Sequence, residues 1–175
     1  MEPLSPEKLE DWIDLVDLSA VALPDDKVAE CEYFLDLAST EKDTSHFRWQ
    51  ISAFFNAAYS FFEIAALGAY QTYCHPETGD YIEDSEALDN LRYYVKVIQN
   101  SKNPSYVKTA GLHEVTAKLY EFRKRNTHHY PLSIMASGNS LPENFQFGYI
   151  PGKGTPALAF CHEVMALIRQ VNQKS

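Results

Sequence analysis

The stretch EFRKRNTHHYP, residues 121–131, places three cations beside two adjacent histidines and a proline that stops a helix. Three kinds of chemistry fit these residues, and the sequence leaves all three open. Cations and histidines suit the negative C-terminal end of a helix dipole, which would make the stretch a solvated helix end. The same imidazoles could ligate a metal ion, and an arginine–histidine pair could act on RNA.

The metal interpretation has the least support in the sequence. Adjacent histidines on a helix point about 100° apart, so His128 and His129 could share one ion only where the helix has ended. His75, His113 and His162 lie elsewhere in the chain, without an HxxxH, HExxH or Cys–His spacing to join them. The sequence therefore predicts no metal ligands and no cofactor.

Phosphodiester chemistry needs a base and a cation brought together by one helix end. An imidazole can take the proton from a ribose 2′-hydroxyl near neutral pH. A guanidinium can clamp the phosphate and stabilise charge in the transition state. Arg123 and Arg125 lie on opposite edges of the apolar stripe formed by Leu112, Leu119 and Phe122. That position close to the core would hold them rigidly, which a solvated charge run does not require.

One long apolar segment, HFRWQISAFFNAAYSFFEIAALGAY (residues 46–70), carries polar residues that could support such a site. These residues follow one another at steps of 4, 4, 4 and 3 and so share one helical face: Arg48, Ser52, Asn56, Ser60 and Glu63. An unpaired buried polar group costs about 1–3 kcal/mol, so this face must meet polar partners. It either fixes the helix register or supports a site on a neighbouring helix.

The same segment is long enough to span a membrane. Asn56 and Glu63 argue against that, because a central carboxylate costs roughly 2.5–3.5 kcal/mol on insertion scales. A helix buried at the centre of a bundle explains the apolar surface better, and we expect no membrane association.

The rest of the chain is also predicted to be mostly helical. Caps, prolines and apolar spacing predict helices at six places: from Ser5, after Pro24-Asp25-Asp26, from Asp43-Thr44-Ser45 to His75-Pro76, from Asp84 or Ser85, from Asn103 to Tyr130-Pro131, and from about Pro156 to Val171. With no alternating strand pattern, the sequence predicts an all-α, up-and-down bundle of about five to six helices.

The chain is expected to form a single helical domain, 1–175, in four parts. Residues 1–27 would be an acidic N-terminal helix, 28–130 the core, and 156–175 a C-terminal helix. Residues 131–155 hold four of the seven glycines and are predicted to be a long irregular loop. The loop either covers a site or packs on the bundle through Phe145, Phe147 and Tyr149, an alternative that the sequence leaves open.

The net charge of −9 is concentrated at one end. Residues 1–43 hold 13 acidic and three basic residues, whereas residues 44–175 hold 11 acidic and 12 basic ones. A small basic site is therefore allowed, but a broad surface that tracks phosphates is not supported. Three cysteines without metal-type spacing, and an acidic start without a signal-peptide pattern, predict a cytoplasmic protein.

The long helix HFRWQISAFFNAAYSFFEIAALG, followed by a later helix that ends in FRKRNTHHYP, resembles the HEPN superfamily over roughly residues 28–130. Members of this superfamily are α-helical, usually homodimeric, and often carry an arginine followed by a histidine after four to six residues. Many are metal-independent endoribonucleases of toxin–antitoxin, phage-defence or RNA-processing systems, and others are non-catalytic binding or scaffolding proteins. The resemblance implies a HEPN-like bundle, a homodimer, and an RNA, a nucleotide or an antitoxin-type protein as partner.

The resemblance also implies roles for particular residues. Arg123 would clamp the phosphate, and His128 or His129, after four or five intervening residues, would act as general acid/base. HEPN proteins often place Asn, Asp or His directly after the arginine; here Lys124 follows Arg123, whereas Asn126 follows Arg125. The residues implied to bind substrate or to support the site are Arg125, Asn126, Asn56, Ser60 and Glu63.

Overall fold

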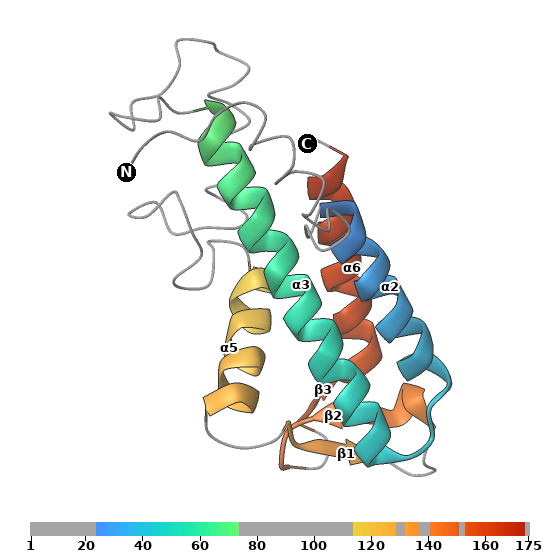
Figure 1. Cartoon of the computed structure of the whole chain (residues 1–175). Helices are drawn as coiled ribbons and strands as arrows, with labels where there is room; N and C mark the ends of the chain where they lie inside the picture. The colour runs from blue at the N-terminus through green and yellow to red at the C-terminus, as the bar shows by residue number, and fades with distance from the viewer. Residues whose placement is uncertain (1–23, 74–113, 129–131, 137–140, 151–152, 174–175) are drawn as a thin grey trace, which may run out of the picture.

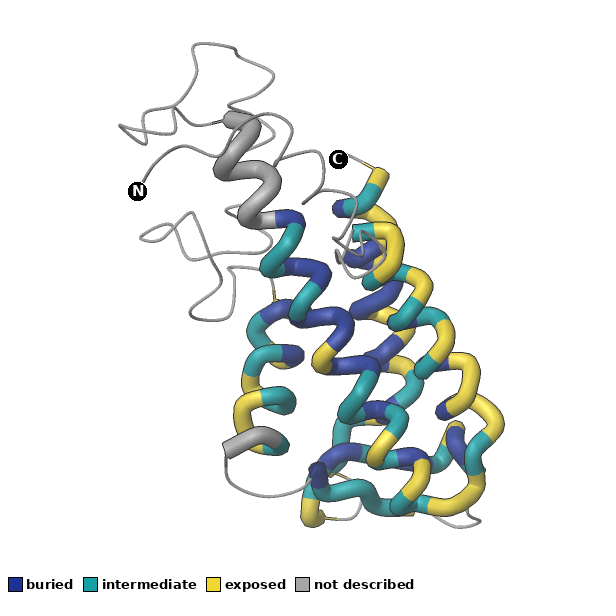
Figure 2. The backbone as a smooth tube through the Cα atoms, viewed as in Figure 1, coloured by how far each residue is buried: buried dark blue, intermediate teal, exposed yellow. Residues whose placement is uncertain are grey.

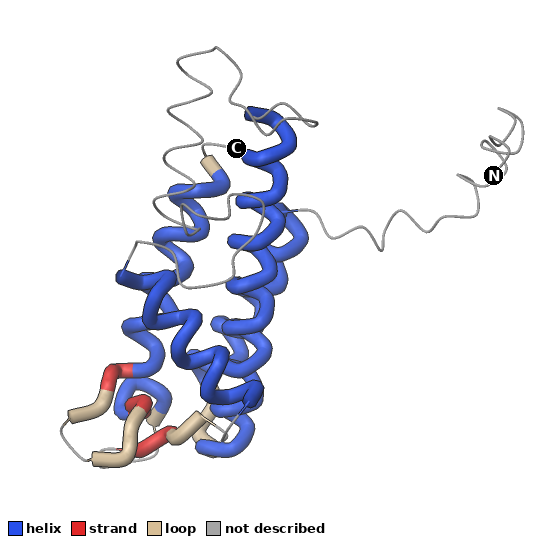
Figure 3. The backbone as a smooth tube through the Cα atoms, turned by 90° about the vertical axis from the view of Figure 1, so that its left-hand side faces the viewer, coloured by secondary structure: helices blue, strands red, loops and turns tan. Residues whose placement is uncertain are grey.

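The computed structural model describes residues 24–73, 114–128, 132–136, 141–150 and 153–173, and these are mostly helical (Figure 1). Four described helices form the body of the protein: α2 (Pro24–Thr40), α3 (Thr44–Tyr73), α5 (Glu114–His128) and α6 (Ala157–Asn172). A small antiparallel sheet lies at one end of them (Figure 3). Its strands are β1 (Ile134–Ala136), β2 (Phe145–Phe147) and β3 (Thr155–Pro156), with the 3₁₀ helix η2 (Pro142–Asn144) leading into β2.

Helix α3 begins at its predicted cap, whereas α2 begins at Pro24 rather than after Asp26. Helix α2 starts at Pro24, and Asp25 in its first turn is favourably placed for the helix dipole. The Asp43 Oδ1 atom caps α3, because it accepts hydrogen bonds from the backbone N–H groups of His46 and Ser45, both at 2.9 Å. These two hydrogen bonds hold the pKa of Asp43 below its usual value.

Helix α3 lies at the centre and packs against α2, α5 and α6. Buried positions, dark blue in Figure 2, recur along α3 between half-buried and exposed ones. Phe55 contacts rings from three other elements: Phe122 of α5, Phe147 of β2 and Phe160 of α6, with centroids 6.0, 5.6 and 6.0 Å away. None of the described helices is both long and apolar enough to cross a membrane.

Helices α5 and α6 also agree with the predicted pattern over the residues described. Helix α6 covers nearly the whole predicted range, with Phe160 and Val164 buried on its inner face. In α5, Leu119 is buried and Phe122 packs against the core. The predicted helices from Ser5 and from Asp84 or Ser85, and the expected beginning of the fifth helix at Asn103, lie outside the described residues.

The small sheet corrects the prediction of a purely all-α fold with an irregular loop over 131–155. Ile134 pairs with Phe147, and Gln146 pairs with Pro156, in an antiparallel register. Strands of two or three residues are too short to show a period-two pattern, which is why the sequence did not reveal them. Phe145 packs on Phe47 of α3 with ring centroids 4.6 Å apart.

The loop prediction holds for two of its three aromatic residues. Phe145 and Phe147 are buried beneath the sheet, as expected, but Tyr149 is 74% exposed and does not anchor the segment. Gly148, directly before it, has φ +139°, a conformation that residues with a side chain rarely adopt. The backbone leaves β2 sharply at this glycine, so the strand alternation that would point Tyr149 inward ends there.

Candidate functional site

The candidate site lies along the contact between α3 and α5. The two helices are antiparallel, because Ser52 early in α3 meets Asn126 late in α5, while Tyr59 farther along α3 meets Tyr120 earlier in α5. The polar face predicted on α3 therefore does meet polar partners on the helix that ends in the Arg–His motif. This arrangement brings together the two stretches on which the RNA-cleavage hypothesis depends.

Asn126 ties the last turn of α5 to two other segments. Its Nδ2 atom donates to the Ser52 hydroxyl at 3.1 Å, and that hydroxyl donates in turn to the Arg48 carbonyl at 2.8 Å. Its Oδ1 atom accepts a hydrogen bond from the Leu132 backbone N–H at 3.2 Å. The side chain of Asn126 therefore links α5 both to α3 and to Leu132, six residues farther along the chain.

Arg123 is held against the middle of α3. Its guanidinium carbon lies 4.1 Å from the centre of the Tyr59 ring, within the range of a cation–π interaction. Tyr59 is buried, and its phenol hydrogen-bonds to the carboxyl group of Glu63, one turn farther along α3. Arg123 also acts electrostatically on Glu63. The three side chains form one cluster, which we call the Arg123 cluster.

Burial shifts the titration of two members of the Arg123 cluster. The pKa of Glu63 lies above its usual value because burial disfavours the carboxylate, and this outweighs the opposing effects of Arg123 and of the Tyr59 hydrogen bond. The pKa of Tyr59 is raised by burial and then by the negative charge of Glu63. Tyr59 therefore stays protonated at physiological pH and can donate a hydrogen bond to the Glu63 carboxyl group.

The other two cations of the motif point away from this cluster. Lys124 is exposed, with its Nζ atom 5.9 Å from the Tyr120 ring centre. Arg125 is exposed, and its Nε atom lies 4.0 Å from the Glu121 carboxylate on the outer face of α5. Of the two arginines in the motif, only Arg123 is placed against α3.

Helix α5 is described as far as His128, so the described part of the motif lies in its last turns. The side chain of His128 and the whole of His129 lie outside the described part of the chain. The distance from Arg123 to either histidine, which would distinguish a catalytic pair from a structural helix end, therefore also lies outside the described part of the chain. The described part of the site consists of Arg123, Asn126 and the α3 side chains that contact them.

Of the five residues predicted on the polar face of α3, Ser52 and Glu63 interact with α5 residues, and Tyr59 adds a contact that was not predicted. Glu63 belongs to the Arg123 cluster, but Asn56 is exposed and Ser60 is half-buried. A signal for Tyr59 was present, because it lies one turn before Glu63 and seven residues after Ser52, and so shares their face of the helix.

No group of three His, Cys, Asp or Glu side chains within the described ranges could hold a metal ion. His162 is exposed on α6, while His75 and His113 fall in ranges that the structure does not describe. Cys31 and Cys161 are buried and form no disulfide within the described part of the chain, and burial raises the pKa of Cys31 to about 12. Cys74 lies outside the described residues.

Comparison with known proteins finds no matching family model, no matching curated protein and no matching solved structure.

Proposed function

We propose that the protein is a metal-independent endoribonuclease with its site at the C-terminal end of α5. The observation that carries this proposal is the placement of Arg123, whose guanidinium is stacked 4.1 Å over Tyr59 and lies five residues before His128. A guanidinium that is already held in one position can stabilise a developing phosphate charge without reorganising. Its flat array of donors also fits two phosphate oxygens at once.

Each residue of the motif has a distinct task in this reaction. His128 or His129 takes the proton of a ribose 2′-hydroxyl, and the freed oxygen attacks the neighbouring phosphorus. The bond from phosphorus to the 5′-oxygen breaks, and that oxygen leaves with a proton supplied by a general acid. The products are a 2′,3′-cyclic phosphate end and a 5′-hydroxyl end. Arg123 stabilises the negative charge on the phosphate oxygens throughout.

Asn126 and Glu63 act as positioning residues. Asn126 restrains the segment that carries both histidines through its hydrogen bond from Leu132. Glu63 and Tyr59 restrain Arg123 from the side of α3. Arg125, which is exposed beside Glu121, is assigned an accessory contact to phosphate. Asn56 and Ser60 keep a supporting role on the same helix.

The direct test is cleavage of mixed single-stranded and structured RNAs in EDTA. The variant Arg123→Ala/His128→Ala/His129→Ala should lose at least about a hundredfold in rate, the lower end of what general acid–base catalysis contributes. The matched control is Arg169→Ala/His162→Ala, which removes an exposed arginine and an exposed histidine of α6 and should cleave normally. Single variants at the two histidines then identify the base.

Two further results bear on the mechanism. RNA with a 2′-deoxy sugar at the cut site should not be cleaved, since it lacks the attacking oxygen. Cleavage that is equally fast in the triple variant and in the control would refute the assignment of the site.

A second candidate is a non-catalytic nucleotide- or protein-binding module, including one that binds an antitoxin-type protein. It is favoured by the electrostatic contact between Glu63 and Arg123, because a phosphate must compete with a carboxylate for the guanidinium. This function predicts binding of a 2′-deoxy RNA without turnover of the matching RNA. The triple variant would then weaken binding, measured by fluorescence anisotropy, and no cleavage would be seen in any variant.

A further inference from the structure

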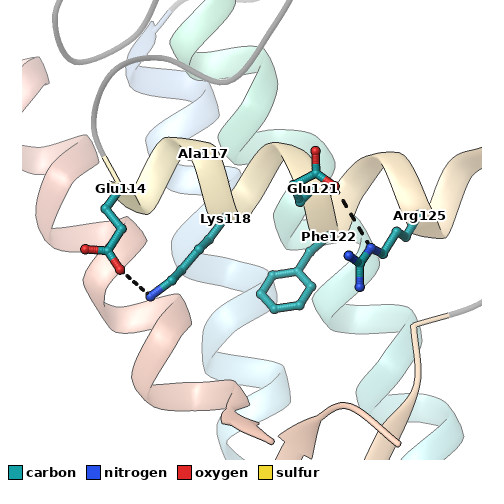
Figure 4. A pocket seen from close by; sticks show the side chains of 6 residues that line it. All are labelled: Glu114, Ala117, Lys118, Glu121, Phe122 and Arg125. Carbon is teal, nitrogen blue, oxygen red and sulfur yellow. Dashed lines mark ion pairs between the residues drawn. The ribbon is translucent and has the colours of Figure 1, made fainter.

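The outer faces of α5 and α2 both carry apolar side chains, but the two faces differ in charge. On α5, six side chains line a depression of about 360 Å³ (Figure 4): Glu114, Ala117, Lys118, Glu121, Phe122 and Arg125. The two acids and two bases of this depression form ion pairs with one another along the helix, so it does not select a partner by charge. The outer face of α2 is strongly acidic instead.

An apolar ridge runs along the exposed side of α2. Ala29, Tyr33 and Leu37 follow one another at four-residue steps, so they form one row on the helix surface. Tyr33 is 62% exposed and Leu37 is 39% exposed. The Tyr33 ring meets Phe34 edge to face with centroids 5.4 Å apart, and Phe34 packs against the core. The most exposed ring of the ridge is therefore supported from below before any partner binds.

Acidic side chains flank this ridge on both sides. The neighbouring row of the helix surface carries Glu32 and Asp36 on one side, and Asp26 and Glu30 on the other. Glu30 and Glu32 already form ion pairs within the chain, but neither Asp26 nor Asp36 does so with any described residue. Helix α2 holds five acidic residues and one lysine, a balance of −4. The ridge therefore lies in a negative electrostatic field.

We propose that the outer face of α2 binds a basic amphipathic helix of a partner protein. A row of side chains four residues apart fits the groove between two such rows on another helix, which favours a helical partner over an extended one. Apolar side chains of the partner would cover Tyr33 and Leu37, and lysine or arginine on either side of them would meet the acids. The ridge and the acids beside it, residues 25–37, span about 18 Å, so the partner needs about three to four turns.

The charge of α2 argues against two occupants from the same chain. The α2 face of a second copy would bring acids against acids, which is unfavourable. Residues 1–23 hold six acidic residues and one basic residue, so they carry the same sign of charge as α2. The cations that the ridge selects must therefore come from a partner of opposite charge.

The position and size of this face set what the contact can do. In the view of Figure 1, α3 lies between α2 and α5. The α2 face shares no residue with the proposed ribonuclease site, so neither inference depends on the other. One helix face of about 18 Å buries less than the roughly 1,200–2,000 Å² of a stable interface. The partner should therefore bind with a dissociation constant in the micromolar range.

The test measures the binding of a synthetic peptide to the full chain by fluorescence anisotropy. The probe is a fluorescein-labelled helix of about 14 residues, or about 21 Å, with leucine along one face and lysine on both sides of it. A second peptide has the same composition in an order that scatters the leucines around the helix, so it measures attraction by charge alone. The unchanged protein should bind the first peptide at least about tenfold more tightly than the second.

Two double variants then locate the peptide on α2. Tyr33→Ala/Leu37→Ala removes the ridge and should weaken binding of the first peptide at least about tenfold. Asp26→Asn/Asp36→Asn removes two of the flanking charges and should weaken it about threefold or more. All four side chains are exposed, so both variants should fold, and circular dichroism checks this.

The matched control for the charge variant is Glu121→Gln/Glu163→Gln. It removes two exposed acids of α5 and α6 and so lowers the net negative charge of the protein by the same amount. This control should bind the first peptide like the unchanged protein. The proposal would be overturned if the first peptide did not bind at about several hundred micromolar, if both peptides bound equally, or if the ridge variant bound as tightly as the unchanged protein.

Discussion

The two sides of α3 are stabilised by different physics. Towards α6 and the sheet, Phe55 and its neighbours form an apolar cluster of rings that exclude water, an interaction that is strong but has little directional preference. Towards α5, Ser52, Tyr59 and Glu63 meet Asn126 and Arg123 through interactions that require particular atoms at particular distances. The apolar side contributes more to the free energy of unfolding, whereas the polar side determines where α5 and its motif lie.

The largest expected effect is on the apolar side. Replacing Phe55 with alanine removes a 1%-exposed ring that touches α5, β2 and α6 together. The free energy of unfolding should fall by about 3–5 kcal/mol, from lost burial and the cavity left behind. Urea denaturation measures it, with Tyr33→Ala as the control, because Tyr33 is 62% exposed and its loss should change stability by less than about 0.5 kcal/mol. Equal losses in both variants would contradict this account of the core.

The next effect is on the polar side. In Asn126→Ala, the Ser52 hydroxyl and the Leu132 N–H each lose a partner in a half-buried position, so stability should fall by about 1–3 kcal/mol. Asn172→Ala is the matched control. Asn172 donates a hydrogen bond to Asp25 at an exposed site, so its loss should change the free energy of unfolding little. Hydrogen exchange should also show faster exchange at Leu132 in Asn126→Ala. An unchanged exchange rate there would show that Asn126 does not restrain the histidine segment.

The apolar side was also the more predictable from sequence. The buried positions Cys31, Leu35 and Ala38 of α2 follow from helix periodicity, and the α3 cap follows from Asp43. Hydrophobic burial depends on the sum of many residues, so a pattern over a dozen positions is enough to reveal it. The sheet was not predicted for the converse reason, because strands of two or three residues are too short to repeat a period-two pattern.

The polar side was predictable as a face but not as a set of contacts. The spacing from Arg48 to Glu63 identified which face would meet polar partners. It could not show that Tyr59 would support Arg123, or that Asn56 would be exposed. Which member of a helical face makes contact depends on the crossing and rotation of the neighbouring helix, and those are set by packing rather than by local sequence.

A smaller effect is expected for the guanidinium of Arg123. Arg123→Met keeps much of the side-chain volume but removes the cation over Tyr59, so stability should fall by about 1–2 kcal/mol. Arg169→Met is the matched control on α6, where the exposed pair with Glu32 should contribute at most about 0.5 kcal/mol. Because Arg123 favours the ionised form of Glu63, its removal should also raise the pKa of Glu63 further. Equal stability losses at the two arginines would mean that Arg123 is no better placed than a surface charge.

The smallest effect, the pH dependence of Glu63, tests the polar side most specifically. Its pKa is raised in the folded protein, so between the usual value of 4.5 and that higher value the folded state binds the proton more tightly than the unfolded state. Stability contributed by Glu63 is thus fully present below about 4.5 and is lost as the pH rises through the folded pKa. In Glu63→Gln this loss is absent, while the amide oxygen can still accept from Tyr59.

Melting temperatures of the unchanged protein and Glu63→Gln, compared from pH 4 to pH 7, isolate this contribution, because titrations elsewhere cancel in the difference. Of the groups that face Glu63, a guanidinium keeps its charge over this range, and the phenol of Tyr59 has a raised pKa and stays neutral. The unchanged protein should therefore lose stability relative to Glu63→Gln as the pH increases. If the unchanged protein instead gained stability relative to Glu63→Gln as the pH increases, the attraction of Arg123 would outweigh the effect of burial on the Glu63 carboxylate. The carboxylate would then be the stable form of Glu63, and a phosphate would have to displace it from Arg123.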